Sequence, residues 1–179
     1  MPRYAAFLRA VNVGGRVVKM ERLRQLFEET GFTGVATHIA SGNVLFTAGR
    51  GRAVALEAKI EKALEAGLGW EVTTFLRTPA ELAAVVAALP FSPDAVGEAH
   101  GVYVGFLKEP LSPERHALVH GFRTPGDEFA VTGREVWWLC RSRSSDSDFS
   151  GGKLEKALDV RATFRNLTTV RTIATRLAG

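Results

Sequence analysis

Two short polar segments contain the residue types best suited to chemistry. The first, residues 7–15 (FLRAVNVGG), contains Arg9 and Asn12 ahead of a pair of glycines, and the second, residues 41–43, is Ser-Gly-Asn. Arginine supplies charge, serine and asparagine supply directional hydrogen bonds, and glycine lets a backbone come close to a ligand. Groups of this kind suit a carboxylate or a phosphate.

The surrounding elements are expected to bring these segments together. Periodicity predicts a strand, a helix, two hairpin strands, a helix and a strand at residues 4–9, 20–27, 35–40, 44–46, 56–64 and 72–77. In an antiparallel sheet of this order, the end of the first strand and the turn at 41–43 lie at one edge, beside the start of the first helix. The free N–H groups and the dipole of that helix end favour an anion.

The order β-α-β-β-α-β is the ferredoxin-like pattern, and it recurs in the second half of the chain. We predict an α+β fold with tandem ferredoxin-like (βαββαβ) halves, antiparallel sheets and a C-terminal helix. The predicted domains are a first half at 1–78, a bridging helix and linker at 79–99, and a second half with the C-terminal helix at 100–179. The bridging helix opens on a capping-box pattern from Thr78 to Glu81. The repeat is one of element order, because no side-chain repeat can be aligned.

Composition indicates a folded protein of a reducing compartment. The chain has 179 residues, 46% of them hydrophobic, and a single cysteine, Cys140. One cysteine allows no intrachain disulfide, no signal-peptide pattern opens the chain, and no stretch is long enough to span a bilayer. These features predict a cytoplasmic protein without a membrane partner.

The net charge of +4 is unevenly distributed. Residues 1–52 have a net charge of +5, residues 53–133 of −5, and residues 134–179 of +4. If the two basic ends meet in space, they form a face that concentrates anions.

Three motifs in order resemble a bacterial family of proteins, the domain of unknown function 1697. The chain shows FLRAVNVGG at 7–15, THIASGNVLF at 37–46 and TFRNLTTV at 163–170, where that family has RGINVGG, SGNVVF-like and TRNW-like motifs. The resemblance spans nearly the whole chain. It implies a two-lobed α+β fold with ferredoxin-like halves and implies no activity.

The resemblance also implies which polar residues belong together. Position by position, the family-like residues are Arg9, Asn12, Gly14, Gly15, Ser41, Gly42, Asn43, Thr163, Arg165, Asn166 and Thr168. Three positions depart from the family pattern. Leu167 replaces a common Trp and Ala40 a frequent Gln, while Ala10 replaces the usual Gly, which predicts that this backbone position does not need a positive φ.

Other signals are weaker. His116 and His120 stand four residues apart without a third metal ligand, so neither a metal nor another cofactor is predicted. Cys140 is predicted to be a packed hydrophobe, and Trp137 and Trp138 to place one ring on each sheet face. The polar segment 141–152 is expected to be a mobile connector, with a binding lid as the alternative.

Three functions stay open at this point. The one we favour is binding of a small anionic ligand, phosphorylated or carboxylate, at the edge formed by 9–15, 41–43 and 163–168. The second is an enzyme of unknown reaction that uses the same Arg, Asn and Ser cluster, with His38 as the nearest candidate for a general base. The third is a protein-interaction or nucleic-acid-binding module, and nucleic acid is the weaker partner because no RNP-like aromatic pattern is present.

Overall fold

The computed structural model describes residues 1–12, 14–39 and 42–179. Contacts within it divide the chain into two compact units. The first unit comprises Met1–Leu82 and Ile173–Gly179, and the second comprises Ala83–Thr172. The predicted domain boundaries at 78 and 99 stay a prediction.

The first unit contains four strands and two helices in the predicted order. They are β1 (Arg3–Leu8), α1 (Met20–Glu29), β2 (Thr33–Thr37), β3 (Asn43–Thr47), α2 (Ala53–Leu68) and β4 (Thr74–Arg77). The sheet has the strand order β2-β3-β1-β4, and every neighbouring pair is antiparallel. Strand β2 ends at Thr37, so the predicted alternation does not continue to Ile39, which is exposed at 55%.

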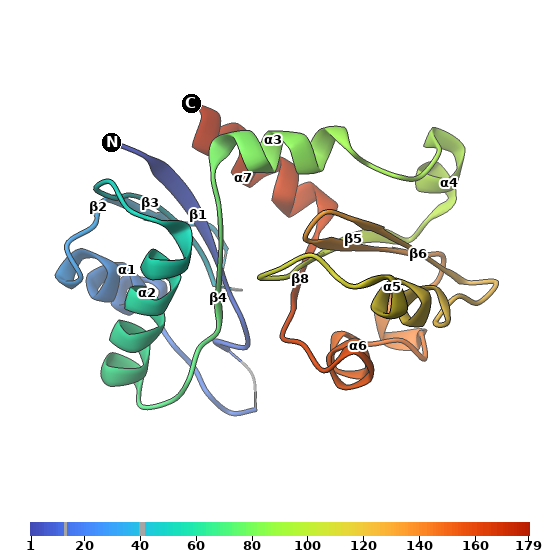
Figure 1. Ribbon diagram of the computed structural model, residues 1–179, viewed down its shortest axis with the longest axis horizontal. Helices are drawn as coiled ribbons and strands as arrows, with labels where there is room; N and C mark the ends of the chain where they lie inside the picture. Colours follow the sequence, from blue (N-terminus) through green and yellow to red (C-terminus); the bar gives the residue numbers. More distant parts are fainter. Residues whose placement is uncertain (13, 40–41) are drawn as a thin grey trace. The chain divides into compact units, whose positions relative to one another are not determined.

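Helices α1 and α2 cover one face of this sheet, as Figure 1 shows. Leu23, Leu26 and Phe27 recur at helical spacing in α1 and are all buried. They meet alternate residues of the strands, such as Phe46, whose ring centroid lies 5.4 Å from that of Phe27. The two periodicities, about 3.6 residues in the helix and 2 in the strand, therefore build one core.

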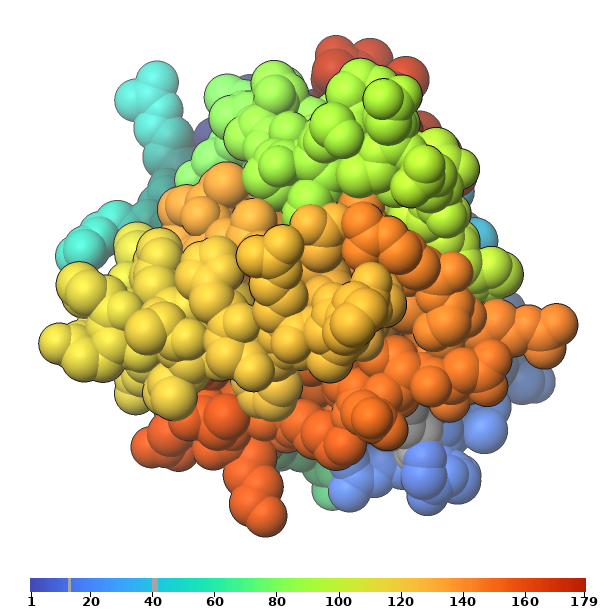
Figure 2. Space-filling model, turned by 90° about the vertical axis from the view of Figure 1, so that its right-hand side faces the viewer, coloured from blue at the N-terminus to red at the C-terminus, as the bar shows by residue number. Residues whose placement is uncertain are grey.

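The second unit repeats this arrangement. It contains α4 (Pro93–Glu98), β5 (Gly101–Phe106), α5 (Pro113–His120), β6 (Asp127–Thr132), β7 (Glu135–Cys140), a 3-10 turn η1 (Ser144–Asp146), α6 (Gly151–Leu158) and β8 (Thr163–Asn166). Its antiparallel sheet has the order β6-β7-β5-β8, the counterpart of the first sheet. In Figure 2, α5 (yellow) and the strands and loop that follow it (amber to orange) form one continuous surface of this unit. The predicted α+β fold of two βαββαβ halves is confirmed.

The two points at which the chain passes from one unit to the other lie within two further helices. Helix α3 (Pro79–Ala87) starts in the first unit, and α7 (Leu167–Ala178) starts in the second and ends in the first. The predicted capping box opens α3: Thr78 N donates to Glu81 Oε2 at 2.8 Å, and Glu81 N donates to Thr78 Oγ1 at 3.2 Å. Within the first unit, the Arg3 guanidinium donates to the carbonyl oxygens of Leu177 and Arg176 at the end of α7.

A side-chain repeat accompanies the repeat of elements, contrary to our expectation from sequence. The last strand of each unit contains a buried arginine, Arg77 at 1% and Arg165 at 7% exposure. Each donates from Nη1 to the carbonyl oxygen of the residue before it, at 2.9 Å in both cases. Burial lowers the pKa of Arg165 to about 10, so its guanidinium is still charged at neutral pH. The halves therefore share a buried cation as well as a topology.

The segment 141–152 contacts the core of the second unit at Ser147 and Phe149, and its mobility stays a prediction. Ser147 Oγ donates to the Asp127 carboxylate at 3.0 Å, and Phe149 is only 5% exposed. The Phe149 ring packs edge-on against Trp138 and Phe129, with centroid distances of 4.8 and 4.6 Å. Phe149, the aromatic residue of this polar segment, therefore packs into the core of the second unit. No helix of the described residues is long and apolar enough to cross a membrane.

Candidate functional site

Three loops of the first unit meet at one edge of its sheet. Leu8 N donates to Gly42 O at 2.9 Å, which joins the segment after β1 to the β2–β3 turn. Arg9 N donates to Thr73 O at 2.9 Å, which adds the segment before β4. We call the surface formed by residues 9–12, 14–19 and 42–43 the loop edge. Of the residues predicted for this place, Ser41 lies outside the described residues.

The backbone of the loop edge is left-handed at several positions. Gly14 and Gly15 have φ values of 61° and 82°, and Gly42 has a φ of 81°. Ala10 has a φ of 56°, so the expectation that this position does not need a positive φ was wrong. A left-handed L-residue costs roughly 1–2 kcal/mol, and such strain persists only where the surroundings impose it. The hydrogen bonds of the neighbouring Leu8 and Arg9 are the surroundings that do so here.

Replacing Ala10 with glycine is expected to raise the free energy of unfolding by about 0.5–1 kcal/mol, as measured by urea denaturation. The gain arises because glycine removes the left-handed strain, although its greater freedom in the unfolded chain takes part of the gain back. Ala99→Gly is the control, since Ala99 has a φ of −73° and glycine there should only destabilise. A loss of stability in Ala10→Gly would show that the alanine methyl group is needed at this position.

The asparagines of the loop edge hold their own loops in shape. Asn12 Oδ1 accepts a hydrogen bond from Val18 N at 2.7 Å, which closes the loop before α1. Asn43 Nδ2 donates to His38 O at 2.9 Å, and His38 N donates to Asn43 O at 3.0 Å. Both side chains therefore position the loop backbone around the edge.

Basic side chains surround this backbone. Arg9, Arg16 and Lys19 belong to the loop edge, and the Arg16 guanidinium lies 5.1 Å from the centroid of the Trp70 ring. The buried indole N–H of Trp70 has no acceptor among the described residues, which is rare for a buried donor. The first unit contains twelve Lys and Arg against eight Asp and Glu, and the second contains eleven of each, so the net charge of +4 belongs to the first unit.

Helix α1 begins at the loop edge. Lys19 is its N-cap residue, and the Lys19 side chain makes no capping hydrogen bond. The N-terminal N–H groups and the dipole of a ten-residue helix thus contribute positive potential at the loop edge. Lys19 is exposed and adds a full charge there.

His38, the candidate general base, already contacts another side chain. Its Nδ1 lies 3.0 Å from Nη1 of Arg176, which also donates to Thr37 O at 3.3 Å. Burial and the Arg176 charge both lower the pKa of His38, so its imidazole is neutral at pH 7. An arginine can only donate, so the Nδ1 lone pair accepts from it and is not available as a base.

The third predicted segment, 163–168, belongs to the second unit, and its meeting with the loop edge stays a prediction. Thr163 Oγ1 accepts from Arg165 Nη1 at 2.7 Å, and Arg165 is almost wholly buried. Asn166 Oδ1 accepts from Thr168 N at 2.8 Å at the start of α7. These polar groups therefore shape the end of β8 and the first turn of the helix.

Sequence reasoning missed a polar network around the buried carboxylate of Asp127 in the second unit. The Asp127 carboxylate accepts hydrogen bonds from Trp138 Nε1 at 2.9 Å, Thr124 Oγ1 at 2.9 Å and Ser147 Oγ at 3.0 Å. Burial alone would raise the pKa of Asp127, but these hydrogen bonds outweigh it and lower that pKa. The signal was available in part, because Asp127 shares its sheet face with Phe129 and so faces the core.

Cys140 and the two adjacent tryptophans are buried as well. The Cys140 thiol donates to Ser142 O at 3.0 Å, and burial is the main cause that raises its pKa, which disfavours the nucleophilic thiolate. Trp137 is fully buried and donates from Nε1 to Thr132 Oγ1 at 2.8 Å, while Trp138 packs in the helix-covered core. Neither ring offers an exposed platform for stacking a base.

Comparisons with known proteins agree with this fold. A family model described as "Protein of unknown function (DUF1697)" matches residues 1–137. The structure of a conserved bacterial protein from Streptococcus pneumoniae aligns with 100% of this chain and 99% of its own, at a TM-score of 0.79 and 24% sequence identity. At that identity the likeness shows the fold alone. No curated protein matches the chain.

Proposed function

Because the chain belongs to the family of proteins of unknown function DUF1697, we propose its function from its own geometry: it binds a small anionic ligand, phosphorylated or carboxylate, at the loop edge of the first unit. The observation that carries this proposal is the set of left-handed residues, Ala10, Gly14 and Gly15, in the loop ahead of α1, whose N-cap residue Lys19 makes no side-chain capping hydrogen bond. Successive turns of this kind aim backbone N–H groups into concavities that suit anionic oxygens.

Charge and shape at the loop edge support the same ligand class. An added Cβ at Gly14 or Gly15 would meet no atom within 4 Å, so open space lies beside this backbone. Lys19 and Arg9 add positive charge, and the excess charge of the protein belongs to the same unit. Together with the helix dipole, these charges raise the local concentration of anions.

The residues of the loop edge divide between contact and support. Lys19, Arg9 and the glycine N–H groups are the proposed ligand contacts, while Asn12 and Asn43 hold the loops that present them. Binding is favoured over catalysis, because the nearest candidate base, His38, accepts a hydrogen bond from Arg176. That the segment 163–168 also contributes to ligand binding stays a prediction from the sequence.

The proposal predicts that replacing Lys19 with alanine weakens anion binding at least about tenfold, since a charge-assisted contact is lost without a change to the core. A thermal-shift screen in low-salt buffer against inorganic phosphate, nucleotides, phosphorylated metabolites and carboxylates would identify the ligand. A ligand at a hundredfold excess over its Kd adds about 2.7 kcal/mol to the free energy of unfolding.

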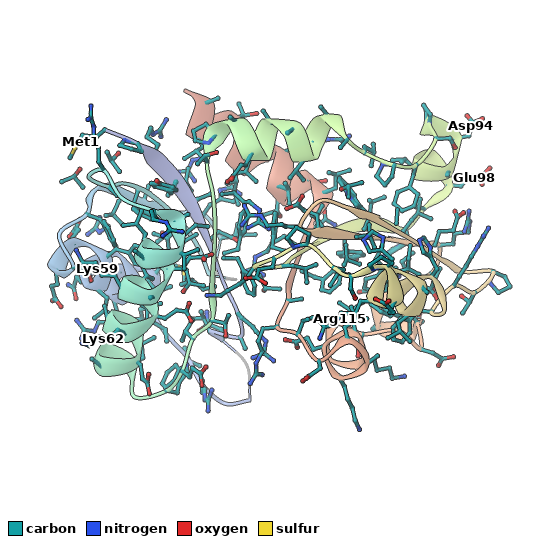
Figure 3. All side chains as sticks on the ribbon, viewed as in Figure 1. Met1, Lys59, Lys62, Asp94, Glu98 and Arg115 are labelled. Carbon is teal, nitrogen blue, oxygen red and sulfur yellow. The ribbon has the colours of Figure 1, made fainter. Side chains whose placement is uncertain are left out.

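Lys62→Ala is the matched control, because Lys62 is an exposed lysine on α2 of the same unit (Figure 3). The control should bind like the wild type. Equal affinities of Lys19→Ala and wild type for the ligand found, or a well-folded wild type with no hit in the whole panel, would refute an anion site at the loop edge.

A further inference from the structure

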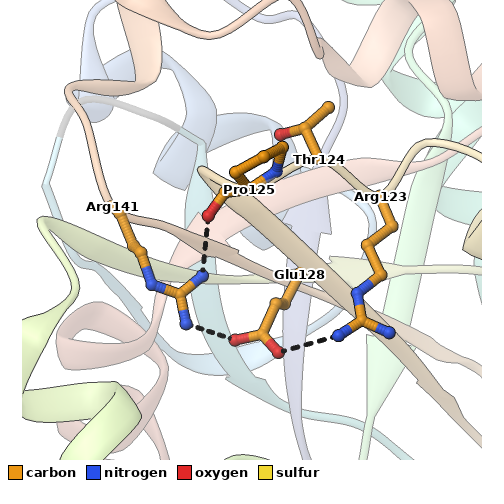
Figure 4. Close-up of a pocket in the computed structure, with 5 residues that line it drawn as sticks. All are labelled: Arg123, Thr124, Pro125, Glu128 and Arg141. Carbon is orange, nitrogen blue, oxygen red and sulfur yellow. Dashed lines mark hydrogen bonds and ion pairs between the residues drawn. The ribbon is translucent and has the colours of Figure 1, made fainter.

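A hollow in the second unit is lined by two arginines that converge on one glutamate. It has a volume of about 360 Å³ and is lined by Arg123, Thr124, Pro125, Glu128 and Arg141. Figure 4 shows Glu128 between the two guanidinium groups, with Arg141 also reaching the carbonyl oxygen of Pro125. Small-ligand sites start at roughly this size, about 300 Å³.

The two arginines are held in different ways. Arg141 Nη2 lies 2.7 Å from Glu128 Oε2, its Nη1 donates to Pro125 O at 3.4 Å, and its backbone N donates to Gly126 O at 2.9 Å. The guanidinium group of Arg141 is therefore held by two contacts, and its backbone by a third. Arg123 Nη2 lies 3.9 Å from Glu128 Oε1, beyond hydrogen-bond distance, and the Arg123 side chain is 70% exposed. Arg123 can move onto a ligand without breaking a hydrogen bond to Glu128.

The net charge of the hollow favours an anionic ligand. Two guanidinium groups and one carboxylate leave an excess of one positive charge within the lining. Thr124 Oγ1 adds no donor, because it donates to the Asp127 carboxylate and accepts from Gly126 N. A cation would meet two positive charges, whereas an anion would complete an alternating arrangement of arginine and acid. Guanidinium groups match phosphate and carboxylate oxygens in a bidentate way.

We propose that this hollow is a second anion site, in which Arg123 and Arg141 bind a phosphate or carboxylate group of a small ligand while Glu128 holds Arg141 in place. Arg141 supplies the fixed donor and Arg123 the donor that closes on the ligand. This site uses no residue of the loop edge, so it does not depend on the function proposed above.

The test follows the Nε–H signals of labelled protein by NMR while inorganic phosphate, and separately succinate, is added in low-salt buffer. The signals of Arg123 and Arg141 should shift with saturation, and Arg123→Ala should weaken that binding at least about tenfold. Arg143→Ala is the matched control, because Arg143 is an exposed arginine of the same unit outside the hollow. It should leave the affinity unchanged.

The direction in which Glu128→Gln changes the affinity for phosphate also tests the proposal. If the hollow takes anions, removing the negative charge raises the affinity for phosphate, by about fivefold or more at this distance. The glutamine amide oxygen can still accept from Arg141, so a lower affinity in Glu128→Gln would show that the negative charge favours the bound ligand, and would overturn the proposal. The proposal would also be overturned if the signals of Arg123 and Arg141 do not saturate with either anion. Lys19→Ala should leave these signals unchanged, which separates the failure of one site from the failure of the other.

Discussion

Replacing Asp127 with alanine is expected to lower the free energy of unfolding by about 2–4 kcal/mol. The substitution leaves the buried Trp138 Nε1, the half-buried Ser147 Oγ and the more exposed Thr124 Oγ1 without the carboxylate that accepts from them. A buried group that loses its partner costs roughly 1–3 kcal/mol, and the two hydroxyl groups, which water can reach, cost less. Urea denaturation followed by tryptophan fluorescence measures the loss, and Trp138 reports on the network directly.

The stabilisation by Asp127 should also depend on pH. Its pKa is lower in the folded protein than the ordinary value of 3.8. The unfolded chain therefore binds a proton at a higher pH than the folded chain does, so stability rises with pH through this window. The contribution is fully present above about pH 4 and is lost as the pH falls through the lowered folded pKa.

Two variants separate the charge of Asp127 from its shape. Asp127→Asn preserves the shape and should lose stability at pH 7, with a difference from wild type that shrinks at lower pH. Asp148→Ala is the matched control, because Asp148 is an exposed aspartate beside Ser147 in the segment 141–152 and should stay within about 0.5 kcal/mol. If the difference between wild type and Asp127→Asn is constant from neutral to acidic pH, the carboxylate charge is not what stabilises the network.

Gly42→Ala is the second substitution expected to have a large effect, about 2–5 kcal/mol of lost stability. Gly42 has a φ of 81°, which costs an L-residue roughly 1–2 kcal/mol. An added Cβ would also lie 3.1 Å from Leu8 Cβ and from Val11 Cγ2, and overpacking of this kind costs about 1–3 kcal/mol more. Leu8 Cβ is fixed by its strand and has little room to yield.

Comparison with Gly69→Ala separates the left-handed strain from the steric contact in that loss of stability. Gly69 has a φ of 90°, but an added Cβ there meets nothing within 4 Å, so only the left-handed strain should appear. Chemical denaturation of both variants gives the comparison. Equal losses would show that the contact of Gly42 with Leu8 and Val11 is not tight. A larger loss in Gly42→Ala should come with weaker anion binding, because the added methyl group pushes Gly42 away from residues 9–12 of the loop edge.

Local patterns were enough to predict the fold. The apolar spacing in α1 reappears as buried Leu23, Leu26 and Phe27, and the capping box of Thr78 and Glu81 forms as expected. The hairpin across Gly133 and Arg134 lies between β6 and β7. These features depend on residues a few positions apart, so the sequence contains nearly all that determines them.

Features that depend on distant partners could not be predicted in the same way. The left-handed Ala10 follows from hydrogen bonds of its neighbours to Gly42 and Thr73, and no local pattern reveals them. His38 meets Arg176 from the far end of the chain. The arginines of the hollow were missed because Arg123 and Arg141 look like ordinary surface charges until Glu128 brings them together.

The first unit is built from both ends of the chain, and this has a consequence for the order of folding during synthesis. Residues 83–172 leave the ribosome before 173–179, so the second unit has all its residues while the first still lacks its last segment. Until that segment emerges, the Arg3 guanidinium has no carbonyl acceptors at the end of α7. Domains usually fold in order from the N-terminus. Here the unit that begins first is the one completed last. Because Arg3 holds the two ends close together, a circular permutant that joins them and opens the chain elsewhere should retain this contact.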